Sequence, residues 1–337
     1  MYGLEKFGTK LGLYNTRKIL ELSGNPHTGL KVIHVAGTNG KGSTVAFISS
    51  IKEAGFRVGV YISPHLINFT ERISINGTQI PEVKVAEILT RLKPYIARVA
   101  AESEFSHPTF FEVVTAMAFI YFAEEQVDFV VLEVGLGGRL DATNVIDKPL
   151  AVVITNSDYD HMDILGSAIT SIAREQAGII KKGSLAITAA RGSALTVIKK
   201  ICHEQDARLY RVGNDIKFET LETNREWQSF NVDGIFSRFE NLNIFLLGKH
   251  QLINACCAIA AVELLKFHDI LITPEAVKNG LKKAYLPCRL EIVRRSPVVI
   301  LDGAHNYPAA RELKKALLEF AENTYLILIW VYFETRK

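Results

Sequence analysis

A glycine-rich segment that follows a short apolar run most constrains how this chain can fold. Residues 32–36 read Val-Ile-His-Val-Ala, and residues 37–44 read Gly-Thr-Asn-Gly-Lys-Gly-Ser-Thr. A continuous apolar run is typical of a strand buried on both faces of a parallel sheet, and a helical pattern begins after the glycines. Glycines at this density allow a tight turn and a close approach of the backbone to a ligand. The segment therefore predicts a strand, a loop and a helix within a covered sheet.

The residue types in this loop suit the binding of phosphate groups. Backbone amides of a glycine-rich turn and of a helix N-terminus are donors for phosphate oxygens. Lys41 adds a positive charge, and a hydroxyl two or three residues later suits Mg²⁺. The spacing departs from the common P-loop pattern, since Gly42 and Val35 stand where Ser or Thr and Gly are usual. We predict a nucleotide-binding loop, with a purely structural turn as the alternative, made of Gly37, Thr38, Asn39, Gly40, Lys41, Gly42, Ser43 and Thr44.

The composition indicates a globular chain with room for one large domain and part of another. It has 337 residues, of which 48% are hydrophobic. The 39 basic and 36 acidic residues are well mixed, which argues against nucleic acid as the main partner. No segment reaches about 20 consecutive apolar residues, so we expect no membrane partner, a cytoplasmic location and a monomer. The four cysteines lack Cys-x-x-Cys spacing and are expected to be reduced thiols.

Apolar runs alternate with helical patterns through the first 200 residues. This alternation predicts an α/β fold with a parallel sheet covered on both faces. The predicted strands are Val32–Ala36, Val58–Ile62, Val127–Val134, Ala151–Thr155 and Ser184–Thr188. Intervening helical segments include Val45–Ala54 and Phe111–Glu124.

From residue 207 to residue 247 the pattern changes to short strands separated by polar turns, which predicts a small antiparallel β unit. Its predicted strands are Arg208–Val212, Ile216–Thr220 and Ser237–Glu240. Helical patterns return at Asn254–His268 and Pro274–Ala284.

A new β-α-β pattern begins near Arg294. It consists of a strand at Val298–Leu301, a loop at Asp302–Asn306, a helix at Pro308–Glu322 and a strand at Tyr325–Phe333. A unit of this size is too small to bury its own core. We therefore predict an ATP-binding domain over residues 1–291, with the small β unit inside it, and the front part of a second, Rossmann-like α/β domain over residues 292–337.

Polar residues follow several of the predicted strands, where ligands of parallel sheets gather. Glu133 ends a strand and precedes a glycine-rich segment, so its carboxylate is placed to bind Mg²⁺. His161 follows the next strand; it is interpreted as a metal ligand or as a partner of a carboxylate, with a structural histidine as the alternative. Asn254 starts a predicted helix, where it could instead be a cap. Arg289 is placed to clamp phosphate oxygens.

The polar loop of the second unit has the same position after its first strand. It contains Asp302 and His305, which we expect to face the same cleft.

Taken together, the order of these motifs resembles the folylpolyglutamate synthase / dihydrofolate synthase family, a branch of the Mur ligases. The likeness runs along nearly the whole chain. The segments that carry it are Leu4–Gly8, Leu11–Leu13, Gly37–Ser43, Ser63–Leu66, Phe69–Ile73, Asn76–Gly77, Thr109–Glu112, Glu133–Asn144, Thr155–His161, Ala177–Lys181, Gly248–Asn254, Arg289–Glu291 and Asp302–Asn306.

The resemblance implies ATP-dependent formation of an amide between L-glutamate and a folate or dihydropteroate, by way of an acyl phosphate. It implies catalytic roles for Lys41, His161 and His305, and it implies that Mg²⁺ is held by Ser43, Glu133 and His161. Nucleotide contacts are implied for the loop residues 37–44 and for Asn254, Arg289 and Asp302. Residues implied to border the pterin-carrying substrate are Ser63, His65, Arg72, Thr109, Phe111 and Glu112.

The chain departs from the family in two places. Gln176 stands where the family has a lysine that is typically carbamylated and serves a second Mg²⁺, and an amide cannot be carbamylated. The family's second domain also normally continues for about another hundred residues. The sequence therefore leaves three alternatives to the folate-type ligase: a nucleotide-binding remnant with little ligase activity, a related Mur-type ligase with another acceptor, and a simple P-loop ATPase or kinase. It does not separate dihydrofolate synthase from folylpolyglutamate synthase.

Overall fold

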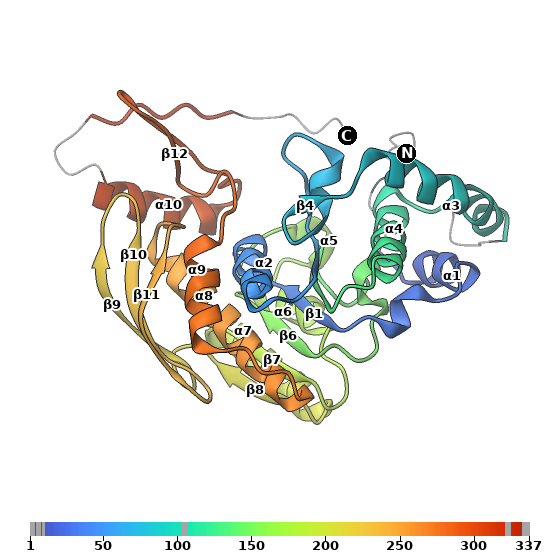
Figure 1. Cartoon of the computed structure of the whole chain (residues 1–337), viewed down its shortest axis with the longest axis horizontal. Helices are drawn as coiled ribbons and strands as arrows, with labels where there is room; N and C mark the ends of the chain where they lie inside the picture. The colour runs from blue at the N-terminus through green and yellow to red at the C-terminus, as the bar shows by residue number, and fades with distance from the viewer. Residues whose placement is uncertain (1–3, 5–7, 9–10, 103–106, 321–324, 332–337) are drawn as a thin grey trace.

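An eight-stranded sheet forms the centre of the fold, as the computed structural model of the chain shows (Figure 1). The structure describes residues 4, 8, 11–102, 107–320 and 325–331. The strand order is β4-β3-β2-β5-β1-β6-β7-β8, and neighbours from β2 to β8 pair in parallel. The strands are β1 (Val32–Ala36), β2 (Val58–Tyr61), β3 (Ile73–Ile75), β4 (Thr78–Gln79), β5 (Phe129–Glu133), β6 (Ala151–Ile154), β7 (Leu185–Thr188) and β8 (Arg208–Arg211).

Helices cover both faces of this sheet. They are α1 (Tyr14–Leu22), α2 (Lys41–Ser49), α3 (Glu82–Glu102), α4 (Phe110–Glu124), α5 (Met162–Leu165), α6 (Ile169–Ala177), α7 (Gly192–Glu204), α8 (Lys249–Leu264) and α9 (Pro274–Lys283). Short 3₁₀ turns occur at η2 (Pro26–Gly29), η3 (Ser50–Ala54), η4 (Phe69–Arg72), η5 (Ala142–Val145) and η6 (Leu265–His268).

Alternate residues of the buried strands pack on opposite faces. In β1, Ile33 and Val35 join the core shared with α2 and α8, whereas Val32 and Ala36 face the opposite side. On that side α1, α3 and α4 cover one half of the sheet, and α6 and α7 cover the other. All five residues of β1 are buried, which is why this strand reads as a continuous apolar run. The predicted α/β fold with a doubly covered parallel sheet is confirmed.

The small β unit differs from its prediction in one strand. Arg208–Val212 was expected in the antiparallel unit, but β8 pairs in parallel with β7 at the edge of the large sheet. The antiparallel unit consists of β9 (Lys217–Thr223), β10 (Gln228–Asp233) and β11 (Arg238–Ile244), in the order β11-β10-β9. An edge strand is covered less than a central one, so β8 reads as amphipathic and resembles an antiparallel strand.

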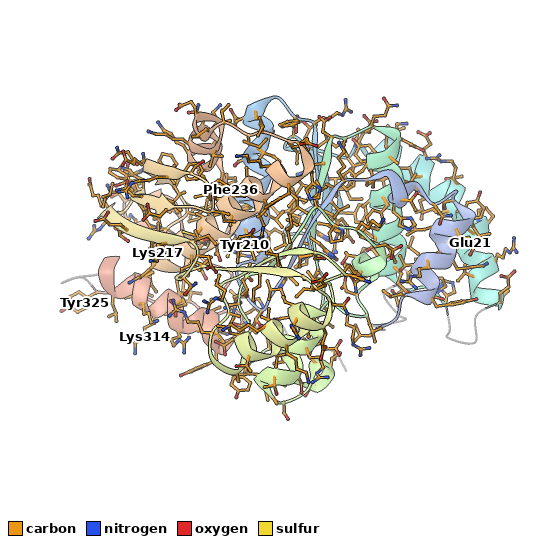
Figure 2. All side chains as sticks on the ribbon, turned by 90° about the horizontal axis from the view of Figure 1, so that it is seen from below. Glu21, Tyr210, Lys217, Phe236, Lys314 and Tyr325 are labelled. Atoms are coloured by element: carbon orange, nitrogen blue, oxygen red, sulfur yellow. The ribbon has the colours of Figure 1, made fainter. Side chains whose placement is uncertain are left out.

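Glu263 on α8 fastens the turn between β10 and β11. Its carboxylate accepts hydrogen bonds from the backbone amides of Ile235, Phe236 and Ser237, at 2.6, 3.0 and 2.8 Å. Phe236 lies at the outer surface of this turn (Figure 2). The carboxylate therefore holds the appended sheet against the helix.

We expect Glu263→Ala to lower the free energy of unfolding by about 2 kcal/mol, because three amide donors lose a charged acceptor. Chemical denaturation would measure this loss. Glu240→Ala, at an exposed carboxylate of β11 that pairs with Arg238, is the control and is expected to change stability by less than about 0.5 kcal/mol. Equal effects of the two substitutions would contradict the anchoring role.

The helix α8 is sandwiched between the large sheet and the three-stranded sheet. Residues Lys249–His268, which include α8 and η6, have the length and mean hydropathy of a membrane span, contrary to the expectation that no segment would. However, 72% of this segment is buried within the fold, as in the core helix of a globular protein. Its apolar composition is thus explained by packing on two sides.

The cysteines are free thiols, as predicted. Cys202, Cys256 and Cys257 are buried, and Cys288 is partly buried. Burial raises the pKa of the Cys202 thiol to about 11 and that of Cys257 to about 12, so neither is a reactive thiolate near neutral pH.

The second unit begins with an antiparallel ribbon, β12 (Glu291–Arg295) and β13 (Val298–Leu301), followed by α10 (Tyr307–Phe320). The ribbon strand β12 was not predicted. Residues 325–331 contain no strand, so the predicted strand Tyr325–Phe333 is wrong over that part, and residues 332–333 lie outside the described residues. A strand forms only with a pairing partner, and an apolar pattern alone does not supply one. The proposed domain boundary near residue 291 stays a prediction.

The second unit lies beside α8 and the small sheet, at the end of the molecule opposite α1 (Figure 2, where Lys314 marks α10 and Glu21 marks α1). A small apolar cluster joins it to the rest of the chain: Ala316 of α10 packs with Leu247 and Leu290. This packing brings the loop between β13 and α10 toward the carboxyl end of the large sheet.

Candidate active site

The loop between β1 and α2 has the conformation expected of a phosphate loop. Gly37 and Gly40 have φ of +140° and +85°, and Gly40 caps α2. A Cβ on Gly37 would lie 2.0 Å from Thr155 Oγ1, and one on Gly40 would lie 2.4 Å from Asn254 Oδ1. Glycine is therefore required at both positions, because φ is positive and because a Cβ would overlap neighbouring atoms.

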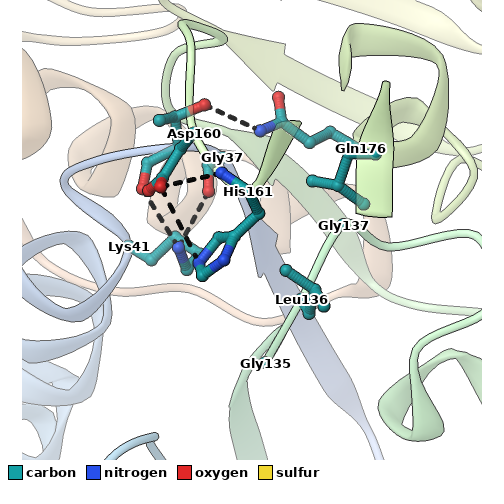
Figure 3. Close-up of a pocket in the computed structure, with 10 residues that line it drawn as sticks. Gly37, Lys41, Gly135, Leu136, Gly137, Asp160, His161 and Gln176 are labelled. Carbon is teal, nitrogen blue, oxygen red and sulfur yellow. Dashed lines mark hydrogen bonds and ion pairs between the residues drawn. The ribbon is translucent and has the colours of Figure 1, made fainter. Parts of the chain in front are cut away.

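The Lys41 ammonium lies over this loop. Its Nζ donates to the carbonyl oxygens of Gly37 and Thr38, at 2.8 and 3.2 Å (Figure 3). Lys41 is the first residue of α2, so its charge stands at the helix N-terminus, where phosphate oxygens bind. The predicted loop residues 37–44 thus lie at the carboxyl end of β1 and in the first turn of α2.

The residues directly after β6 hold the phosphate loop in place. Thr155 Oγ1 donates to Asn39 O at 2.7 Å, and Asn39 N donates to Asn156 Oδ1 at 2.8 Å. Thr38 N donates to Asn156 O at 2.9 Å. The backbone of the loop is therefore held by the residues directly after β6, as the neighbouring positions of β1 and β6 in the sheet dictate.

Gln176 is a second brace. It is 2% exposed; its Nε2 donates to Thr38 Oγ1 at 3.0 Å, and its Oε1 accepts from the Ser157 hydroxyl. Both ends of the amide are engaged with protein groups, so its oxygen is not directed at a metal. The residues present do not fit the second Mg²⁺ that the resemblance implies, because the neutral Gln176 amide, bonded to Thr38 and Ser157, stands where a negatively charged ligand would be needed.

Glu133 lies on the other side of the phosphate loop. It ends β5, is 5% exposed, and accepts a hydrogen bond from Ser63 N at 3.2 Å. Burial raises the pKa of this carboxyl group, while the positive charges of Lys41 and Arg289 lower it. A Cβ on Gly42 would lie 3.3 Å from Leu286 Cδ2 and 3.9 Å from both carboxylate oxygens, so Gly42 lies next to the carboxylate at the start of α2.

A small pocket separates the phosphate loop from the glycine-rich segment after β5 (Figure 3). Lys41, Asp160 and His161 lie on one side of it, and Gly135 and Gly137 lie on the other. His161 has φ of +47° and its Nε2 is 3.9 Å from Asp160 Oδ1. The structure therefore supports the pairing of His161 with a carboxylate, and places that pair beside the lysine.

Asp141 organises the glycine-rich segment. It is 3% exposed and accepts hydrogen bonds from Leu136 N at 2.9 Å, from Thr143 N at 2.9 Å and from Thr143 Oγ1 at 2.5 Å. Thr143 in turn bonds His34 Nε2 at 2.9 Å, and burial lowers the pKa of His34 to about 3, so His34 is neutral. The role of this carboxylate was not predicted, because Asp141 lies within a segment whose most conspicuous residues are glycines.

Asn254 packs directly on the phosphate loop. It lies in the second turn of α8, whose N-cap is Gly248, so the alternative interpretation as a helix cap is wrong. Its Nδ2 donates to Gln251 Oε1 at 3.0 Å, and its side chain fills the space above Gly40.

The second unit contributes residues to the same site. Asp302 accepts from Leu290 N and Ala304 N at 2.9 and 2.8 Å, so its carboxylate braces the segment that carries Arg289. A Cβ on Gly303 would lie 2.6 Å from Arg289 Nη1. His305 Nε2 is 4.0 Å from Asp160 Oδ2, and His161 Nε2 is 3.9 Å from the other oxygen of the same carboxylate. The predicted residues of the second unit are thus brought to the phosphate loop, with Asp302 in a bracing position.

The predicted substrate residues lie in the segment after β2 and at the N-terminus of α4, and Ser63 of that segment donates to Glu133. Arg72 donates to His65 Nδ1 at 2.7 Å and lies over the Phe110 ring at 5.3 Å. Thr109 and Glu112 form the capping box of α4, so their polar groups serve the helix N-terminus.

Phe111 borders the glycine-rich segment, since a Cβ on Gly135 would lie 2.4 Å from the tip of its ring. The edge of the ring therefore packs on a bare glycine backbone, which leaves no room for a side chain at residue 135. Glu71, in the same loop as His65, accepts from the amides of Leu66, Ile67 and Asn68; burial raises its pKa, but these three donors outweigh burial and lower it. The loop is therefore held in one shape by a charged anchor.

The donors present fit one Mg²⁺ beside the phosphates. Within the described ranges no three His, Cys, Asp or Glu side chains converge on a protein-only metal site. Mg²⁺ usually takes one or two carboxylates and completes its shell with phosphates and water. Glu133 and the buried hydroxyl of Ser43, at the N-terminus of α2, are of the right chemistry for that arrangement.

Several known proteins are similar to this chain in sequence and in fold. The Mur ligase middle domain family matches residues 35–262. The dihydrofolate synthase/folylpolyglutamate synthase of Bacillus subtilis (strain 168) is 40% identical over 334 residues, which are 98% of this chain and 77% of that protein. The structure of folylpolyglutamate synthase from Thermotoga maritima aligns with a TM-score of 0.83 at 40% identity, over 92% of this chain and 71% of that chain.

A structure of an FPGS-AMPPCP-folate complex aligns with a TM-score of 0.86 at 33% identity, over 93% of this chain and 78% of that chain. The fold, the phosphate loop and these relatives agree, and the chain therefore belongs to the folylpolyglutamate synthase / dihydrofolate synthase family of ATP-dependent Mur-type ligases.

Proposed function

We propose that this chain joins L-glutamate to the carboxylate of a folate or dihydropteroate at the expense of ATP, in the cytoplasm. The observation that carries the proposal is that Lys41, which lies over the phosphate loop, and Arg289, which directly precedes the second unit, are both near enough to Glu133 to lower the pKa of its carboxyl group. The ligands of one similar structure, the FPGS-AMPPCP-folate complex, are a nucleotide analogue and folate, and they support ATP and a folate as ligands of this chain.

The reaction proceeds in two steps. An oxygen of the substrate carboxylate attacks the γ-phosphorus of ATP, the bond to the bridging oxygen breaks, and ADP leaves. The amine nitrogen of glutamate then attacks the acyl carbon, phosphate leaves with the electron pair of the carbon–oxygen bond, and the nitrogen loses a proton. Formation of the acyl phosphate replaces a poor leaving group, the oxygen of the carboxylate, with a good one, phosphate.

The protein's part is positioning and neutralisation of charge. The loop amides and the Lys41 ammonium hold the phosphates. Arg289, which is near enough to Glu133 to lower the pKa of that carboxyl group, stabilises charge on the transferring group. Mg²⁺, held by Ser43 and Glu133 with His161 near it, would neutralise the phosphate oxygens when bound. Phe111 and the Ser63–Arg72 loop border the acceptor.

Release of ADP tests this proposal. Continuous release over many turnovers is expected to require both glutamate and one of the two acceptors, dihydropteroate or a reduced folate, whereas the acceptor alone permits no more than one ADP per enzyme. The accepted substrate distinguishes dihydrofolate synthase from folylpolyglutamate synthase. ADP release with neither acceptor would indicate a simple ATPase, and release with a different carboxylate would indicate a Mur-type ligase of another specificity.

We expect Glu133→Gln to raise the Mg²⁺ concentration needed for half-maximal nucleotide binding by at least about tenfold, because the substitution keeps the shape and removes the charge. Titration of Mg²⁺ at a fixed concentration of a non-hydrolysable ATP analogue measures it. Glu87→Gln, at an exposed residue of α3, is the control. An unchanged Mg²⁺ dependence in Glu133→Gln would exclude Glu133 as a ligand.

A further inference from the structure

Asn306 connects the second unit to the phosphate loop. It lies directly before α10 and far from the loop in sequence, yet its side chain forms a reciprocal amide pair with Asn39. In this pair each Nδ2 donates to the other residue's Oδ1, at 3.1 Å in both directions. The two partners are 267 residues apart in the sequence.

The remaining capacity of the Asn306 amide is also used. Its second Nδ2 hydrogen is donated to Asp160 Oδ2 at 2.7 Å, and its Oδ1 also accepts from Ala309 N at 2.9 Å, which caps the first turn of α10. A flipped amide would place its oxygen against the Asp160 carboxylate and its NH₂ against the Ala309 amide. The surroundings therefore fix one orientation, which only an amide side chain satisfies.

Both partners of Asn306 make further contacts, and Asp160 Oδ1 accepts a hydrogen bond from His161 N at 2.9 Å. The Asn39 backbone is held by Thr155 and Asn156. Asp160 lies between His161 and His305, at 3.9 and 4.0 Å. Asn306 thus joins a braced loop of the first unit to the helix of the second unit, in a partly buried position.

The position of this bridge relates to the reacting groups. His305 is the neighbour of Asn306 in the chain, and Arg289 lies against Gly303 in the same loop. A shift of this loop relative to Asn39 would therefore move a guanidinium and an imidazole relative to the phosphates. Misplacement by about 1 Å can cost about 10²-fold in rate.

We propose that Asn306 is a positioning residue: through Asn39 and Asp160 it sets the second unit on the phosphate loop and so places Arg289 and His305 for phosphoryl transfer. The bridge itself is independent of the substrates, and its consequence for rate rests on the proposed function.

Asn306→Ser tests the bridge. Serine keeps an oxygen that can cap α10, but it is too short to pair with Asn39 and Asp160. In the ligand-free protein we expect amide hydrogen exchange to become at least tenfold faster across residues 37–41 and 302–306, while the thermal midpoint changes by no more than a few degrees. Asn279→Ala, at an exposed asparagine of α9, is the matched control and is expected to leave exchange unchanged.

Catalysis supplies a second readout. If the second unit acts in phosphoryl transfer, Asn306→Ser lowers kcat for ATP turnover at least tenfold and changes KM for ATP less than threefold, because Thr155 and Asn156 still hold the backbone of the more mobile loop in its binding conformation. Asn306→Gln does not restore the geometry, since its longer side chain displaces the amide from Asn39. A uniform fall in thermal midpoint with unchanged kcat would identify a merely structural residue.

Pairing is tested by combining substitutions. Asn39→Ala and Asn306→Ala are expected to be non-additive in exchange protection, because either one alone removes the shared pair. Additive effects, or unchanged exchange in Asn306→Ser, overturn the proposal. If the wild-type chain shows no ligation but the exchange and coupling results hold, the bridge stands and the proposed function fails.

Discussion

Lys41→Ala is expected to lower the rate of ATP turnover by about 10²- to 10³-fold. The ammonium lies over the phosphate loop, 2.8 Å from Gly37 O, and it is the first residue of the helix whose N-terminus receives the phosphates. Removal of one preorganised donor to charge that develops in the transition state typically has an effect of this size. Single-turnover measurement of ADP formation, with both acceptor and glutamate present, checks it.

The matched control is Lys199→Ala, which removes an exposed lysine from α7 and is expected to leave turnover unchanged. Nucleotide affinity separates two causes of a low rate. We expect the affinity of Lys41→Ala for an ATP analogue to fall less than its rate. A variant with full turnover would show that the loop lysine does not serve the reaction and would remove the main basis for the nucleotide site.

Gly37→Ala is expected to have the second largest effect, by disrupting the loop itself. The residue has φ of +140°, and its Cβ would lie 2.0 Å from Thr155 Oγ1 and 3.1 Å from the backbone of Asn156. Backbone strain and overlap together are expected to lower the free energy of unfolding by about 2–4 kcal/mol. Because the loop must move to accept a methyl group, the affinity for ATP should also fall at least tenfold.

Gly183→Ala separates strain from overlap. Gly183 has φ of +72°, but a Cβ added there would meet nothing within 4 Å, so only backbone strain of about 1 kcal/mol is expected. Denaturant unfolding and calorimetric nucleotide titration of both variants provide the comparison. A stability loss in Gly37→Ala no larger than in Gly183→Ala, with normal nucleotide affinity, would contradict the tight contact between the loop and the residues after β6.

The parts of the fold that could be predicted are those whose burial leaves a pattern in the sequence. β1 is buried on both faces and its bounds agree with the prediction. The antiparallel strand β10 was not predicted, because only two of its residues are apolar and its third buried residue is the polar Gln228, whose Nε2 is bonded to two backbone carbonyls. The edge strand β8 was assigned to the wrong sheet for a related reason, since partial cover weakens the apolar run.

The site could be predicted where residue type and loop position coincide, as for Lys41 and Glu133. The residues that hold the site in place could not be predicted. Asn39 and Asn306 are common polar residues, and their pairing depends on the packing of α10 beside the sheet, which no local pattern encodes. Gln176 was noted for the charge it lacks, whereas the structure shows what it binds: Thr38 and Ser157.

The most direct test of the proposed ligation is the mass of the product formed from Mg-ATP, glutamate and, in separate reactions, dihydropteroate or a reduced folate. We predict the addition of one glutamyl unit to at least one acceptor, with one ADP released for each amide formed. ATP binding without a glutamyl product on either acceptor would contradict a folate-type ligase.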